Sequence, residues 1–506
     1  MGEPRRFALN PMDNIMPRFN INFVLTFGLK PGVPFQQVHD LLQASLQSAA
    51  DELPIFRRRV FAVPAAHDQT NQTTAGRLEA REHPDWTPQV VFNDLSESWP
   101  DYQDLLDEGL PQDELDGAQL LPPAPTDLDP EGEGAAAIVA QANFVHGGLL
   151  LAACHFHSLV DGMSGSLLLK MWAKHMRIHQ GVDERMARLD IPPSNCDYDL
   201  VPRAWQDAGN KVPPPHEVQK ASPETWRLLG LLPPLFPEEM AAKRAFSLDP
   251  TAAPPPPEMQ TSVFYVSASA FAALTAAAAP PKADSESTVV PTANDALMAL
   301  LWRCVMRARL AADPASPAYA APGALAELDT TLDGRALFSD ALPWAYMGTL
   351  IFIATTRMAV ASVVAPSHRI PLSTIAAEVR RSVKSITRER LHEAYGLAAA
   401  MDGAELASAG LRYPFATFAG AESCFTSFLS MPVMDASLGS GVFVNGGTPD
   451  YMRPPRREFD VVCRRCVILP PRPAGGFEIL LSLKKGEMEA LERDEEFAEF
   501  AQFLCH

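Results

Sequence analysis

The chain has 506 residues, of which 47% are hydrophobic and 20% charged. It can therefore bury large cores, which excludes the disordered, collagen-like and disulfide-scaffold classes. At roughly 100 to 200 residues per domain, we expect two large domains. The formal net charge of −19 gives no positive field for a polyphosphate backbone, so nucleic acid is not an expected partner.

The N-terminus and the cysteines predict a cytoplasmic protein. Met1–Arg6 leads into a mixed polar and apolar stretch without an apolar signal core, and the seven cysteines are an odd number scattered over the chain. Both features are typical of the reducing cytosol. The most apolar long window, Trp344–Ala365, contains Arg357 near its centre, so we expect buried strands there and no contact with a membrane. We expect a monomer.

Helix and strand patterns alternate in the first half. Apolar residues at helical spacing predict a helix over Val38–Ala50. Two apolar runs, Ala137–Val145 and Leu149–His157, are joined by His146-Gly147-Gly148 and predict a hairpin. Helical spacing returns over Ser164–His179.

A proline-rich region separates the halves. Residues 196–258 show little periodicity and contain the runs Pro213–Pro215 and Pro254–Pro257, which favour extended chain. We therefore predict an N-terminal lobe over residues 1–195, a crossover over 196–258 and a C-terminal lobe over 259–506.

The second half is again mixed. A helix over Ala296–Leu310 is preceded by Thr292–Asp295, which has the spacing of a capping box. Near the end, Val461–Leu469 and Phe477–Leu483 predict a hairpin, and Glu487–Phe503 an acidic amphipathic helix. The fold class is therefore α/β in two lobes.

The most informative segment ends the second strand of the first hairpin, where His157 is followed by Asp161 and Gly162. A His-x-x-x-Asp spacing is expected about once by chance in such a chain, and a second one, from His179 to Asp183, has the sequence context of a solvated surface pair.

The context of the first motif is different. A strand, a tight Asp-Gly turn and an amphipathic helix can present the imidazole of His157 at a cleft, and period-2 alternation puts His155 on the same face. The alternative is that His157 is a satisfied core histidine and that Asp161 only caps the following helix. Local sequence leaves these two interpretations about evenly balanced.

Beyond this segment, the chain resembles the BAHD acyltransferase superfamily, in particular its fungal branch of trichothecene 3-O-acetyltransferase-like enzymes. The HxxxDG motif of that family matches His157, Asp161 and Gly162. Further matching segments follow in the expected order over nearly the whole chain: Leu9–Arg18, Gln141–Leu149, Thr292–Arg303 and Leu332–Arg335.

This resemblance implies two chloramphenicol-acetyltransferase-like lobes, each a mixed sheet flanked by helices, joined by a long crossover. A channel between the lobes would admit an acyl-CoA thioester from one side and an alcohol or amine from the other. His157 would be the general base, because a neutral imidazole can take the hydroxyl proton. Asp161 would pair with Arg335 and, with Gly162, support the corner. Neither a metal nor a permanently bound cofactor is implied.

The chain also departs from the family pattern at several positions. The second family signature, DFGWG, corresponds to the segment Asp435–Gly441. Only its two glycines are retained here, as Gly439 and Gly441, and both are candidates for a structural role. The family pattern Thr-Ser-Trp becomes Thr426-Ser427-Phe428, so the indole donor is lost and Thr426 is the candidate that stabilises the oxyanion. Tyr-Phe-Gly-Asn becomes Tyr346-Met347-Gly348-Thr349.

Two other groups of side chains are candidates for ligand binding. Phe428 and Met431 would suit an apolar substrate if they face a cleft. Cys463 and Cys466 form one CxxC pattern without a second pair, and incidental thiols are a better interpretation of it than zinc or redox chemistry.

We therefore predict an acyltransferase that moves a short acyl group, most simply from acetyl-CoA as co-substrate, to a hydroxyl of a small apolar natural product. Three alternatives stay open. An isomerase or cyclase could use His157 without an acyl donor. A condensation-type enzyme would have HHxxxDG, but Phe156 precedes His157 here. A non-catalytic binding protein would not need the motif.

Overall fold

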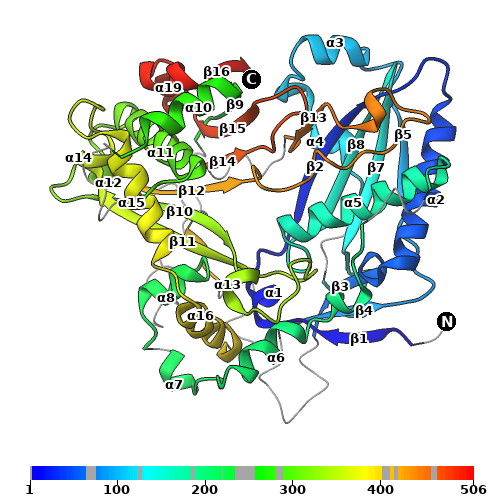
Figure 1. Ribbon diagram of the computed structural model, residues 1–506, viewed down its shortest axis with the longest axis horizontal. Coiled ribbons are helices and arrows are strands. Elements are labelled where there is room, and N and C mark those ends of the chain that lie inside the picture. The colour runs from blue at the N-terminus through cyan, green and yellow to red at the C-terminus, as the bar shows by residue number, and fades with distance from the viewer. Residues whose placement is uncertain are drawn as a thin grey trace, which may run out of the picture.

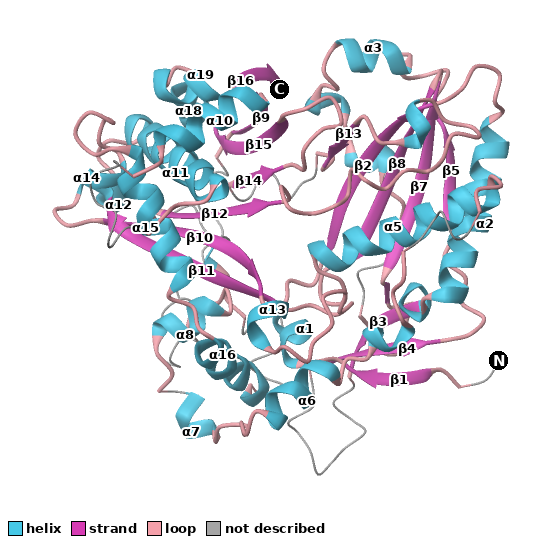
Figure 2. Ribbon diagram, in the orientation of Figure 1, coloured by secondary structure: helices cyan, strands magenta, loops and turns pink. Residues whose placement is uncertain are grey.

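The computed structural model describes residues 3–63, 76–123, 128–183, 189–218, 220–233, 257–280, 289–401, 411–414, 420–456 and 464–506. Figure 1 shows two lobes side by side, each with its own large β-sheet, and Figure 2 shows helices packed on both sheets. The predicted two-lobed α/β fold is confirmed.

The N-terminal lobe is built on a five-stranded mixed sheet. In order across the sheet the strands are β13 (Tyr451–Arg453), β2 (Asn20–Gly28), β8 (Gly148–Phe156), β7 (Ile138–Val145) and β5 (Val90–Asp94). β7 and β8 form the predicted antiparallel hairpin, and Gly147 has a φ of 77° in its turn, a conformation that favours glycine. The two predicted helices are α2 (Phe35–Glu52) and α5 (Gly162–His179), which pack together on this sheet.

A smaller antiparallel sheet extends the N-terminal lobe. Its strands are β1 (Arg5–Ala8), β4 (Leu78–Glu82), β3 (Arg58–Ala62) and β6 (Ala135–Ala136). Short helices connect the described elements of this half: α1 (Pro11–Ile15), η1 (Pro54–Arg57), α3 (Tyr102–Asp107), η2 (Gln112–Glu114), α4 (Gly117–Leu120) and η3 (Pro193–Cys196).

The C-terminal lobe has a seven-stranded mixed sheet. Its strands are, in order, β11 (Ile351–Ala359), β10 (Leu325–Asp333), β12 (Glu422–Ser427), β14 (Arg465–Ile468), β15 (Phe477–Lys484), β9 (Met259–Val266) and β16 (Gln502–Cys505). The predicted pairing of β14 with β15 is confirmed.

Helices cover this second sheet. They are α10 (Ala268–Ala277), α11 (Ala293–Ala312), α12 (Pro317–Ala320), α14 (Val360–Val363), α15 (Leu372–Lys384), α18 (Lys485–Leu491) and α19 (Glu495–Phe500). The short helix α13 (Arg335–Phe338) follows β10, and its Phe338 belongs to a separate apolar core. The predicted capping box starts α11: the Thr292 amide donates to the Asp295 carboxylate at 2.7 Å, and the Asp295 amide donates to the Thr292 hydroxyl at 3.2 Å.

The prediction of one helix over Glu487–Phe503 is wrong. The Asp494 carboxylate accepts the Phe497 amide at 2.9 Å and thereby caps a new helix, α19, after α18 has ended. The last residues then leave as β16 and pair with β9, where Phe503 lies opposite Phe264. Long-range strand pairing therefore outweighs the local helical pattern.

The region predicted as an irregular crossover contains helices where it is described. These are α6 (Leu200–Asp207), α7 (Pro215–Val218) and α8 (Pro223–Leu228), and they pack with α1 and α16 (Arg388–Ala400) into a third apolar core. Proline at the first helical position favours a helix start, so prolines here begin helices. Most of the run Pro254–Pro257 lies outside the described residues.

The chain crosses between the lobes a second time. After β12 it enters the core of the N-terminal lobe, pairs there with β2 as β13, and returns to the other sheet as β14. The C-terminal lobe predicted for residues 259–506 thus sends one segment into the N-terminal sheet. Within the described ranges, no helix combines the length and the apolar character needed to cross a bilayer.

Candidate active site

The HxxxDG segment forms a corner between β8 and α5. The backbone amide of His157 donates to the Phe19 carbonyl at 3.0 Å just after β8 ends. Asp161 is the N-cap of α5, and its carboxylate accepts the Ser164 amide at 2.9 Å and the Ser164 hydroxyl at 2.8 Å. The capping role that the sequence left open is therefore real, but it is not the whole role of Asp161.

Asp161 also pairs with Arg335 across the lobes. The carboxylate lies 2.9 Å from Arg335 Nη2, and the two side chains are 1% and 3% exposed. Arg335 Nη2 also donates to the Tyr346 and Gly348 carbonyls at 2.9 Å, and the Leu350 amide donates to Asp161 at 3.3 Å. This buried network joins the start of α5 to the loop before β11.

The network sets the charge of Asp161. Burial alone would raise the pKa of this carboxyl, but the Arg335 guanidinium and the hydrogen bonds from Ser164 and Leu350 outweigh burial and hold the pKa below its usual range. Asp161 is therefore ionised near neutral pH and bound to fixed partners, which suits a structural anchor better than a proton carrier.

His157 lies beside this network with its imidazole half-buried. Burial lowers the pKa of the ring, although its own carbonyl and Asp161 oppose that shift, so the imidazole is neutral near pH 7. Nδ1 is buried without a hydrogen-bond partner among the described residues. The Thr349 hydroxyl donates to the His157 carbonyl at 3.3 Å, so a residue that departs from the family pattern helps to hold the backbone of His157.

Sequence reasoning missed the support from the N-terminus. The Asn10 amide group donates to the Tyr346 hydroxyl at 2.9 Å, and the Thr349 amide donates to the Asp13 carboxylate at 2.9 Å. Burial raises the pKa of Asp13 well above its usual range despite these hydrogen bonds. Asn10 and Asp13 have the spacing of a capping box, and that spacing within Leu9–Arg18 was a usable signal.

The segment after β12 covers the start of α5. Phe428 is 5% exposed and packs edge-to-face on Phe23 with ring centroids 5.0 Å apart. A Cβ atom added to Gly162 would lie 2.8 Å from Met431 Cε and 3.4 Å from the Phe428 ring, so both side chains pack directly on this glycine. Thr426, half-buried near the end of β12, is two residues from Phe428.

The glycine loop in Asp435–Gly441 is attached to the other end of α5. Gln180 accepts the Gly441 amide at 2.6 Å and donates to the Leu438 carbonyl at 2.5 Å. Arg177 donates to the Ser437 carbonyl at 2.6 Å, and Gly439 has a φ of 94°. The loop is therefore held by its backbone.

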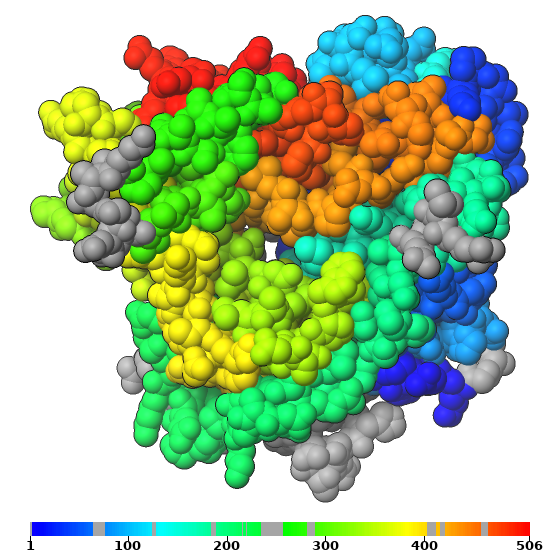
Figure 3. Space-filling view, in the orientation of Figure 1, coloured from blue at the N-terminus to red at the C-terminus, as the bar shows by residue number. Residues whose placement is uncertain are grey.

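Figure 3 shows a hollow at the centre of the visible face, where segments of both lobes meet.

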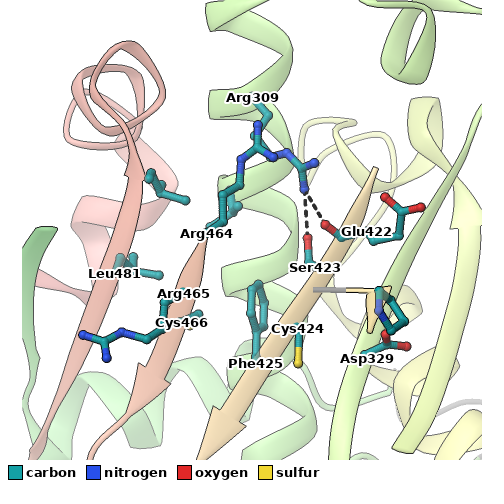
Figure 4. A pocket seen from close by; sticks show the side chains of 13 residues that line it. Arg309, Asp329, Glu422, Ser423, Cys424, Phe425, Arg464, Arg465, Cys466 and Leu481 are labelled. Carbon is teal, nitrogen blue, oxygen red and sulfur yellow. Dashed lines mark hydrogen bonds between the residues drawn. The ribbon is translucent and has the colours of Figure 1, made fainter. Parts of the chain in front are cut away.

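A small cavity lies at the beginning of β12, away from the corner between β8 and α5 (Figure 4). Arg309 lines one edge of it and donates to the Glu422 carbonyl at 2.8 Å and to the Ser423 hydroxyl at 3.3 Å. Arg464 pairs with Glu487. Both of these cations therefore already have protein partners.

The same cavity contains one cysteine of the CxxC pattern. Burial raises the pKa of the Cys466 thiol well above its usual range, which makes it a poor nucleophile. Cys463 lies outside the described residues. In the described part of the chain, no cluster of three or more His, Cys, Asp or Glu side chains could hold a metal ion.

Comparisons with known proteins show the family of the chain. Residues 104–498 match the Transferase family, and residues 20–175 match the Trichothecene 3-O-acetyltransferase-like N-terminal domain. The eremophilane O-acetyltransferase prx11 of Penicillium rubens is 28% identical over 98% of both chains. The isocyanide synthase-NRPS hybrid crmA of Aspergillus fumigatus is 27% identical over 98% of this chain, which spans only 31% of that relative.

Solved structures show the same fold. The crystal structure of TRI101 from F. sporotrichioides, complexed with coenzyme A and T-2, matches 99% of this chain and 100% of that chain with a TM-score of 0.71 and 19% identity. The resemblance to the trichothecene 3-O-acetyltransferase-like branch of the BAHD acyltransferases is thus confirmed, and with it, at the level of the family, the prediction of a transferase. From the matched residues and the shared fold, the chain belongs to the Transferase family and has the N-terminal domain of the trichothecene 3-O-acetyltransferase-like branch.

Proposed function

We propose that the protein transfers an acetyl group from acetyl-CoA to a hydroxyl of a small apolar natural product, with His157 as general base. The observation that supports this best is the corner itself. The neutral imidazole of His157 follows a buried strand, and the buried Asp161–Arg335 ion pair holds the turn between this strand and α5. Such a base needs no serine or cysteine nucleophile.

The residues fit one acyl-transfer sequence. Because Nδ1 of His157 is buried, Nε2 takes the proton of the acceptor hydroxyl as its oxygen forms a bond to the thioester carbonyl carbon. The Thr426 hydroxyl donates to the resulting oxyanion. When the carbon–sulfur bond breaks, the imidazolium returns the proton to the CoA thiolate. Ester and free thiol are the products, and His157 ends neutral.

The substrates follow from chemistry and from similar proteins. Relatives in Penicillium are named as eremophilane O-acetyltransferases, and similar structures hold coenzyme A. Phe428 and Met431, packed on Gly162, would offer an apolar surface to the substrate, and Gly439 and Gly441 would keep the loop beside α5. We further propose that the enzyme acts in the cytoplasm as a monomer, without a metal.

The departures from the family pattern favour one alternative. Phe428 has no N–H donor for an oxyanion, and Thr349 and Ser437 also differ from the family residues. An isomerase or cyclase would tolerate these changes, because it handles no thioester. The condensation-type alternative draws on the similarity to crmA but lacks the first histidine of HHxxxDG.

The test uses purified protein, acetyl-CoA and a panel of eremophilane alcohols. We expect calorimetry to show binding of free CoA, and free thiol to appear only when donor and alcohol are both present. An absence of binding heat with CoA, together with conversion of an alcohol to a product of unchanged mass, would overturn the acyltransferase assignment in favour of the isomerase.

A further inference from the structure

A small cavity adjoins the corner, between α5 and the N-terminal sheet. Its volume is about 30 Å³. Apolar groups form most of its wall, among them Phe23, Leu168, Phe428 and Val433. A cavity needs about 10 to 15 Å³ to admit one water molecule, so this one admits about two groups of that size.

His155 is the polar group with an unpaired nitrogen in this wall. The residue is 9% exposed, and no described residue forms a hydrogen bond with its buried Nε2. A Cβ atom added to Gly165 would lie 2.7 Å from the Cε1 atom of the ring, so α5 holds the ring in place. Burial and the neighbouring His157 lower the pKa of His155 to about 3, and the ring is therefore neutral.

The position of the cavity links it to the reacting groups. Gly162, at the start of α5, lies in its wall together with Phe428. His155 precedes His157 by two residues, and Thr426 precedes Phe428 by two. A thioester carbonyl held between His157 and Thr426 would therefore have the cavity beside it. A natural-product acceptor is far too large for this space, whereas the alkyl end of a short acyl group fits.

We propose that this cavity receives the acyl chain of the thioester donor and that His155 restricts the chain to two carbons. This inference rests on the proposed function. The methyl of an acetyl group and one water molecule on His155 Nε2 would together fill the space. A longer apolar chain would displace that water and leave a buried imidazole nitrogen without a partner, which is unfavourable.

The expected discrimination is about tenfold, in the range that one or two unmatched groups in a pocket produce. The experiment is calorimetry with free CoA, S-ethyl-CoA and S-butyl-CoA, thioethers that need no acceptor and cannot react. In the wild type we expect S-butyl-CoA to bind about tenfold more weakly than S-ethyl-CoA.

Matched variants test whether the His155 nitrogen causes the difference in affinity between S-ethyl-CoA and S-butyl-CoA. His155→Leu keeps the volume and removes the nitrogen, so the difference should shrink to about threefold or less. His155→Gln restores a polar group and should restore the tenfold difference. His179→Leu changes an exposed histidine at the far end of α5 and should bind as the wild type does. Should His155→Leu fail to fold, Leu168→Ala enlarges the same cavity and should improve S-butyl-CoA binding about tenfold.

The outcomes separate the two claims. A wild type without binding heat for free CoA overturns the proposed function, and this inference with it. A wild type that binds free CoA but binds both thioethers equally, or His155→Leu with the wild-type ratio, overturns only the role of His155. An unchanged S-butyl-CoA affinity in Leu168→Ala overturns the placement of the acyl chain in this cavity.

Discussion

The two ends of α5 are held in opposite ways. At its start, the Asp161 carboxylate is buried against the Arg335 guanidinium. At its end, Gln180 and Arg177 bind backbone groups of the glycine loop. A buried ion pair requires those two side chains, because either one alone is an uncompensated charge. A loop held by its backbone requires only the right conformation, so it can lose family side chains and keep Gly439 and Gly441.

The largest effect should come from the base at the side-chain-held end. His157→Ala should lower turnover about 10²- to 10⁴-fold, the usual contribution of general-base assistance, without loss of folding. The measurement is thiol release from acetyl-CoA in the presence of an accepted alcohol. His179→Ala, at the other end of the same helix, is the control and should leave turnover unchanged. Near wild-type turnover in His157→Ala would refute the assignment of the base.

Breaking the ion pair should mainly affect stability. Asp161→Asn leaves the Arg335 charge buried, so the free energy of unfolding should fall by about 3 to 5 kcal/mol. Denaturant unfolding measures it. The control is Asp333→Asn, which removes the other acidic partner of Arg335. That partner is 44% exposed, so the loss there should stay below about 1 kcal/mol.

The same variant has a pH signature. The pKa of Asp161 is lower in the folded protein than in the unfolded chain, so its stabilisation is present above the unfolded value near 3.9 and is lost as the pH falls through the folded value. The difference between wild type and Asp161→Asn should therefore shrink on acidification below about pH 4. A difference that is independent of pH would contradict the ionised pair.

The smallest effect should come from the backbone-held end. Gln180→Ala removes two hydrogen bonds to the glycine loop and should lower the free energy of unfolding by about 1 kcal/mol, with turnover near that of the wild type. Gln36→Ala removes an exposed side-chain contact to Asp40 and is the matched control. A loss as large as that of Asp161→Asn would show that both ends of α5 are held alike.

Elements with a local cause could be predicted from the sequence. The β7–β8 hairpin, α5 and the capping box of α11 follow from periodicity, turn residues and spacing within a few positions. Predicting the corner between β8 and α5 required both a local pattern and a family resemblance. That Arg335 reaches Asp161 could be expected only from the resemblance, since nothing in the local sequence links residues 174 positions apart.

Elements that depend on distant partners could not be predicted. β16 is a strand because β9 lies beside it, and α6 and α8 are helices because a third core receives their apolar faces. The Asn10 and Asp13 contacts join the first turn of the chain to Tyr346 and Thr349. In each case the deciding partner is far away in sequence, so periodicity within the segment does not reveal it.

The pairing of β13 with β2 has a consequence for folding while the chain is being synthesised. The Tyr451 amide donates to the hydroxyl of Thr26, a residue 425 positions earlier in the chain, and β13 is the neighbour of β2 on the side away from β8. At about 5 to 20 residues per second, a ribosome needs roughly 20 to 85 seconds to cover that separation. Throughout that time β2 presents an open strand edge, the kind of surface that joins other chains. The first lobe therefore depends on the last part of translation for its completion.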